Sequence, residues 1–154
     1  MLATVHTFIG AVIALKLKNP WLVFPAAFFS HFLLDLVPHW DAFTMCNVSE
    51  THENITKKDK IKAVLDFLIG LSIGLFFVFQ TLPNGSLATT VFFAAAFSNL
   101  PDALEAPYVF LGSKNPITMT VMKIQHVFHN KEPLPWGIVT QLVTVGLGVF
   151  VLTL

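Results

Sequence analysis

Long apolar stretches separated by short polar breaks run along most of the chain, and this pattern predicts a bundle of membrane-spanning helices. A helix needs about 17–25 mostly apolar residues to cross a bilayer. The stretches that approach this length cover residues 1–15, 21–37, 61–82, 87–100 and 134–154. We therefore expect an all-α fold, a polytopic transmembrane helix bundle with about five spans.

The predicted spans form a single integral-membrane domain, residues 1–154, in which two helical hairpins repeat one another weakly. Residues 5–10 align with residues 65–70, which places His6 opposite Asp66. The predicted parts are hairpin 1 (1–42), a polar loop (43–60), hairpin 2 (61–106), an interfacial segment with a short helix near 116–129 (107–133) and a last span (134–154).

Composition strengthens the prediction of a membrane protein. Hydrophobic residues make up 55% of the chain and charged residues 12%, whereas about 25% of residues are charged in typical soluble domains. The formal net charge is zero and every basic residue is a lysine, which argues against a nucleic-acid partner. The single Cys46 excludes an internal disulfide. The lipid bilayer is the predicted partner, and the sequence leaves the oligomeric state open.

The distribution of lysines predicts an orientation. With five spans, the amino terminus, the 38–60 loop and the 101–133 segment share one side of the membrane. Seven of the nine lysines lie on that side or at its border, and only Lys16 and Lys18 lie on the other. Because cytoplasmic loops are enriched in lysine and arginine, we expect the first side to face the cytoplasm.

The segment from Ser30 to Asp41 concentrates groups that can bind a metal ion or transfer protons. His31 and Asp35 are four residues apart, so they share one face of a helix. Pro38 is expected to end that helix, which places His39 and Asp41 just beyond it. On its own, the first pair could equally be an interhelical hydrogen bond, a common polar contact in membrane bundles.

Other polar residues are predicted to lie near the same face of the membrane. Asp66 lies inside an apolar span, where a charged side chain costs on the order of 3 kcal/mol and usually faces a partner or cavity. Mixed imidazole and carboxylate ligands are typical of zinc and also occur at manganese sites. We therefore predict a site for a divalent metal ion, with zinc the first choice and manganese the second. Its predicted ligands are His6, His31, His39, Asp41, Asp66, Asp102, His126 and His129. Glu105 is the predicted general base. Asp35 is also assigned to catalysis, either as a metal ligand itself or as a carboxylate that orients a metal-binding histidine.

Several short motifs also carry a resemblance to a known family. They are His6, Ser-His-x3-Asp at 30–35, Pro-His-Trp-Asp at 38–41, Leu-Pro-Asp at 100–102 and Gln-His-x2-His at 125–129. Together they resemble a family of metal-dependent hydrolases of the bacterial inner membrane, which is distantly similar to zinc-dependent phospholipase C. The resemblance implies a location in that membrane and a phosphoester substrate.

The first functional hypothesis is therefore a membrane-embedded metal-dependent hydrolase that acts at the cytoplasmic face on a phosphoester or lipid-derived substrate. Two alternatives use the same residues. In one, histidines and aspartates conduct protons or a metal ion across the membrane. In the other, the chain is a non-catalytic membrane scaffold whose polar face docks a cytosolic partner.

Overall fold

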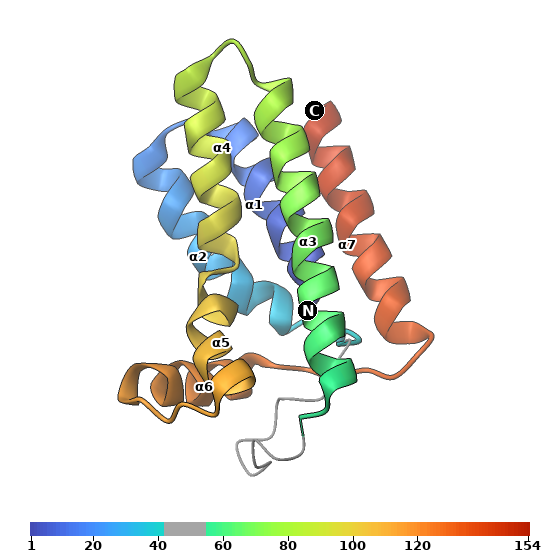
Figure 1. Ribbon diagram of the computed structural model, residues 1–154. Coiled ribbons are helices and arrows are strands. Elements are labelled where there is room, and N and C mark those ends of the chain that lie inside the picture. The colour runs from blue at the N-terminus through green and yellow to red at the C-terminus, as the bar shows by residue number, and fades with distance from the viewer. Residues whose placement is uncertain (42–54) are drawn as a thin grey trace.

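Within residues 1–41 and 55–154, which the computed structural model describes, the chain forms seven α-helices and no strand (Figure 1). The all-α prediction is confirmed for these residues. The helices are α1 (Ala3–Leu17), α2 (Pro20–Asp35), α3 (Lys57–Gln80), α4 (Gly85–Ser98), α5 (Leu100–Leu111), α6 (Pro116–Phe128) and α7 (Trp136–Thr153).

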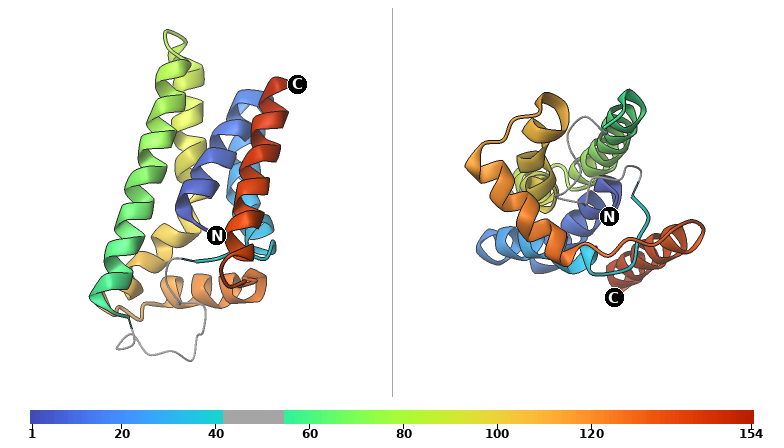
Figure 2. Two further views of the ribbon diagram at one scale, coloured as in Figure 1. Left: turned by 90° about the vertical axis from the view of Figure 1, so that its right-hand side faces the viewer. Right: turned by 90° about the horizontal axis from the view of Figure 1, so that it is seen from below.

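Five of these helices, α1, α2, α3, α4 and α7, run side by side, and α5 and α6 lie at one end of the bundle (Figure 1). Helix α1 is central, because it packs against α2, α3, α4 and α7. Figure 2 shows α6 crossing the end of the bundle near the amino terminus of the chain. The turns between α1 and α2 and between α3 and α4 lie at the opposite end of the bundle, with the carboxyl terminus (Figure 1).

Two helices, α3 and α7, are long and apolar enough to cross a membrane, and the bent pair α4 and α5 would make a third span. This number is smaller than the predicted five. The difference arises from helix length, because α1 has 15 residues and α2 has 16. At 1.5 Å per residue, α1 is about 22 Å long, whereas the hydrocarbon core of a bilayer is about 30 Å thick.

Local sequence explains where α2 and α3 begin and end. Asn19 caps α2 by accepting a hydrogen bond from the Trp21 amide, and the helix ends at Asp35, shortly before Pro38 as predicted. Helix α3 begins earlier than the predicted residue 61, because Thr56 and Asp59 form a capping box. Most of the predicted polar loop, residues 43–54, lies outside the described residues.

The predicted fourth span ends at residue 100, but the chain does not leave helical structure there. Instead the chain bends by 49° between α4 and α5 and continues as a helix. Pro101 lies in the first turn of α5, where the missing amide hydrogen is not needed for the helical hydrogen-bond ladder. The bend directs Asp102 and Glu105 toward the end of the bundle that holds the amino terminus. In α6 the structure agrees with the predicted helix to within a residue.

Small side chains let the central helices approach closely, as is common in membrane bundles. The fully buried core between α1, α2 and α4 consists of Ala11, Ala14, Val23, Ala27, Val91 and Ala94. At Gly10, α1 lies in close contact with α4. A Cβ atom there would lie 2.7 Å from the Ser98 Oγ atom and 2.8 Å from the Ala94 carbonyl oxygen. Only glycine fits this position without moving α4.

We predict that Gly10→Ala destabilises the bundle, because the new methyl group overlaps the backbone of α4. Overpacking of this kind costs about 1–3 kcal/mol. The matched control is Gly146→Ala in α7, where an added Cβ meets no atom within 4 Å and helix propensity favours alanine by about 1 kcal/mol. Thermal unfolding followed by circular dichroism in one detergent measures both variants. Equal midpoints for the two variants would contradict the proposed α1–α4 contact.

Candidate metal centre

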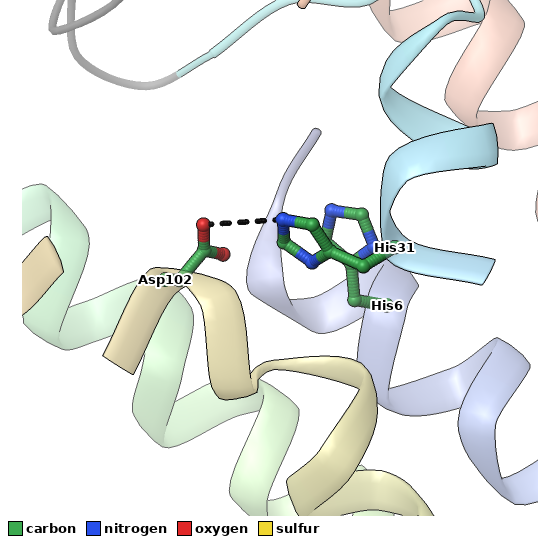
Figure 3. Close-up of side chains that lie close together, drawn as sticks. All are labelled: His6, His31 and Asp102. Carbon is green, nitrogen blue, oxygen red and sulfur yellow. Dashed lines mark ion pairs between the residues drawn. The ribbon is translucent and has the colours of Figure 1, made fainter. Parts of the chain in front are cut away.

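Histidine and aspartate side chains from separate parts of the chain converge near the amino-terminal end of α1, and they form two groups. The first group consists of His6, His31 and Asp102 (Figure 3), and the second of Asp35, His39 and His129. In each group, one ligand atom from every residue lies within 4.8 Å of the others. These buried groups could hold a metal ion, as the sequence predicted for five of the six residues; the sixth, Asp35, was assigned to catalysis.

In the first group, two fully buried histidines are oriented with their rings together. The ring centroids of His6 and His31 lie 4.1 Å apart and the rings are stacked. The Nδ1 atom of His31 lies 2.9 Å from the Ser98 carbonyl oxygen, which can only accept a hydrogen bond. The neutral ring therefore has its proton on Nδ1, and the lone pair of Nε2 faces Asp102 at 3.5 Å.

In the second group, a backbone carbonyl fixes the tautomer of His39 in the same way. Its Nδ1 atom donates to the Val37 carbonyl at 2.7 Å, which leaves Nε2 as the ligand atom. Asp41 lies beside this group, with Oδ1 3.2 Å from His39 Nε2 and Oδ2 2.5 Å from His129 Nε2. Burial alone would raise the pKa of Asp41, but the Met1 amino group and His129 outweigh burial and lower that pKa well below its usual range. Asp41 is therefore an anion.

Asp35 belongs to the second group and also contacts the first. Its Oδ1 atom is 3.2 Å from His6 Nε2, and its Oδ2 atom is 3.4 Å from His31 Nε2. On the other side, His39 and His129 each lie 3.9 Å from one of its oxygens. The side chain of Asp35 is 4% exposed. A carboxylate in this position can share its oxygens between two cations.

Two observations test whether a cation fits here. The buried ring of His6 has no well-directed hydrogen bond on either nitrogen within the described residues, and such an orphaned group is costly unless something binds it. In addition, the Met1 amino group lies 2.5 Å from Asp35 Oδ1 and 2.6 Å from His39 Nε2. Burial opposes its charge, but the pKa of this amine is raised because Asp41 and the neighbouring carboxylates outweigh burial. The site therefore favours positive charge.

A short pairing of two chain segments positions the second group. The His39 amide donates to the Asn130 carbonyl at 3.0 Å, and the Glu132 amide donates to the His39 carbonyl at 2.8 Å. The next residue, Trp40, donates from its amide to the Gly137 carbonyl at 3.1 Å. We call residues 38–41 the site strap. It fixes His39 against the chain that carries His129.

Four residues predicted for the site lie outside both groups: Asp41, which lies beside the second group, and Asp66, Glu105 and His126. Asp66, a predicted ligand, instead caps α1: its carboxylate accepts hydrogen bonds from the Ala3 amide at 2.6 Å and from the Thr4 hydroxyl at 2.6 Å. It thus satisfies donors that every helix leaves open at its first turn. Glu105 and His126 line the cavity next to the groups.

Sequence reasoning missed Gln125. This buried side chain donates from Nε2 to Asp102 Oδ1 at 3.0 Å, and the same nitrogen lies 3.1 Å from His31 Nε2. The i, i+4 spacing of Gln125 and His129 indicates that these two residues share a face of the α6 region. Met122, which is also buried, extends that face by one turn. Attention to helical periodicity, and not only to residue type, would have favoured Gln125 over His126.

A cavity of about 700 Å³ opens onto the two groups. Asp35, Asp41, Asp102 and His129 form part of its wall, so a molecule in the cavity would reach both groups. Comparisons of the chain with family models, with curated proteins and with solved structures find no match.

We predict that Gly137→Ala releases the site strap, because the new Cβ atom would overlap the Glu132 carbonyl and the Trp40 amide nitrogen. An overpacking cost of about 1–3 kcal/mol corresponds to at least about fivefold faster hydrogen exchange at the strap amides if opening is local. Exchange followed by mass spectrometry measures this. Gly146→Ala, in the same helix, is the control and should leave the exchange of His39 and Trp40 unchanged. Unchanged exchange in Gly137→Ala would show that the strap is held by other contacts.

Proposed function

We propose that the chain is a membrane-embedded metal-dependent hydrolase whose site faces the cytoplasm. The observation that carries the proposal is the position of Asp35. Asp35 belongs to the second group, and its carboxylate also contacts both imidazoles of the first group, those of His6 and His31. Hydrolases with two metal ions a few Å apart use such a shared carboxylate to hold both ions.

The donor set favours zinc, with manganese as the second choice. Imidazole nitrogens and carboxylate oxygens are ligands of both ions, and thiolates are absent from the two groups. His31 and His39 each donate their Nδ1 proton to a backbone carbonyl. Metal-ligating histidines are commonly oriented by such a hydrogen bond, which fixes the tautomer and turns Nε2 to the ion.

Bound divalent ions would lower the pKa of a coordinated water toward about 7 and polarise the scissile group. The residues of the chain then divide the remaining work. Gln125 holds Asp102 in place through its amide. Glu105 lines the cavity near the same carboxylate and is the candidate to take and return a proton.

Three further features support this function and its location. Two or three helices are apolar enough to cross a membrane, and seven of nine lysines belong to the end that holds the site or its border, which favours a cytoplasmic site. The motifs that resemble the bacterial inner-membrane hydrolases supply all six residues of the two groups, Asp35 among them through the Ser-His-x3-Asp segment. That resemblance favours a phosphoester substrate.

We predict that substitutions in the groups remove metal selectively. His31→Ala should lose the ion of the first group, His39→Ala that of the second, and Asp35→Ala both, because the Asp35 carboxylate contacts histidines of both groups. His126→Ala is the matched control: it lies in neither group and should retain the parent's content. Elemental analysis of protein purified with zinc supplied measures all four variants. Equal metal in every sample, or none in the parent, would refute the metal site.

We predict that Glu105→Gln slows hydrolysis of a chromogenic phosphodiester by about 100-fold or more, the usual contribution of general acid–base catalysis, while metal content stays at the parent's level. Glutamine keeps the size of the side chain but cannot exchange a proton. Unchanged hydrolysis would remove Glu105 from the mechanism. Metal flux into liposomes without any hydrolysis by the parent would favour the ion-conducting alternative instead.

A further inference from the structure

The walls of the cavity are apolar over most of their length, although its end at the two groups is polar. Phe67, Leu71 and Leu75 of α3 line it at intervals of four residues, so they lie one above another on a single helix face. This apolar face is about 12 Å long at 1.5 Å per residue. Phe92 and Ala96 of α4 form the facing wall.

The cavity is open to its surroundings along α3. Phe67 is 54% exposed and Leu71 is 39% exposed, although both side chains line the cavity. Helix α3 is one of the two helices that are long and apolar enough to cross a membrane by themselves. In a bilayer these openings would therefore meet hydrocarbon, and the cavity would connect the membrane interior with the polar groups at its end.

The chemistry of the walls selects among possible occupants. A peptide segment would bring backbone amides and carbonyls that have no partner along Phe67, Leu71 and Leu75, and such groups are costly to bury in an apolar site. A small water-soluble phosphoester would occupy only the polar end. An acyl chain has no polar groups and gains free energy by burying each of its methylenes.

We propose that this cavity holds the acyl chain of a lipid-derived amphiphile, with the head group of that molecule at Asp35, Asp102 and His129. The placement of the head as the scissile group rests on the proposed hydrolase function, whereas the placement of the tail rests on the cavity alone. The substrate class is accordingly a membrane lipid or lipid fragment that carries a phosphate ester next to its chain. Leu71, in the middle of the α3 face, controls the depth to which the chain enters.

The test uses the full chain in phosphatidylcholine vesicles with hexadecyl phosphate that carries a photoreactive diazirine near the end of its chain. After irradiation, mass spectrometry locates the cross-links. We expect cross-links at Leu71, Leu75 and Phe92 that excess unlabelled hexadecyl phosphate suppresses and that butyl phosphate leaves unchanged. Leu71→Trp should reduce these cross-links several-fold by filling the cavity. Leu68→Trp is the matched control, because Leu68 is exposed on the same helix but does not line the cavity.

Two results would overturn the tail site. One is cross-linking spread equally over Leu68 and the cavity residues with no response to Leu71→Trp, which indicates ordinary contact with bulk lipid. The other is equal suppression by butyl phosphate, which indicates that only the phosphate is recognised. Metal content and phosphodiester hydrolysis are measured on the same samples. Loss of the competed cross-links with hydrolysis intact refutes the tail site alone, and competed cross-links in a protein without metal refute the hydrolase alone.

Discussion

The buried carboxylate of Asp35 is the constraint around which this end of the molecule is arranged. A charged oxygen that is withdrawn from water costs several kcal/mol unless partners compensate it, and the Met1 amino group lies 2.5 Å from Asp35 Oδ1. Four imidazole rings also lie around this carboxylate, those of His6, His31, His39 and His129. One of these partners comes from its own helix, one from α1, one from the site strap and one from the end of α6. The carboxylate therefore links elements that are distant along the chain.

The helices meet at this point because of two features of the backbone. Small residues such as Gly10 let α1 lie deep between α2 and α4, so that His6 reaches the ring of His31. The 49° bend between α4 and α5 then returns Asp102 toward the same place (Figure 3). The first group thus depends on helix packing, whereas the second depends on the hydrogen bonds of the strap.

The site and the cavity offer two different environments to a bound molecule. The polar end concentrates carboxylates and imidazoles with fixed tautomers, a set suited to divalent ions. The apolar walls, formed by side chains such as Phe67, Leu71 and Leu75 of α3 and Phe92 of α4, suit a hydrocarbon chain. An amphiphile matches both parts at once, because its head requires the first environment and its tail the second. A small water-soluble substrate would leave the apolar walls of the cavity without contacts.

The sequence by itself determined the features that depend on neighbouring residues. The four-residue spacing predicted that His31 and Asp35 meet, and Pro38 predicted the end of α2; these two predictions hold because helix geometry is local. The apolar composition predicted membrane-spanning helices, and two or three helices are long and apolar enough to cross a membrane. Only the tertiary structure decided the rest. Asp66 has the residue type and depth of a ligand, yet the first turn of α1 lies against it and takes its hydrogen bonds. Gln125 is in the site and His126 is not in either group, since the rotation of α6 against α5 is set by packing. The number of spans also depends on where helices begin, bend and end, which hydropathy averaged along the chain does not resolve.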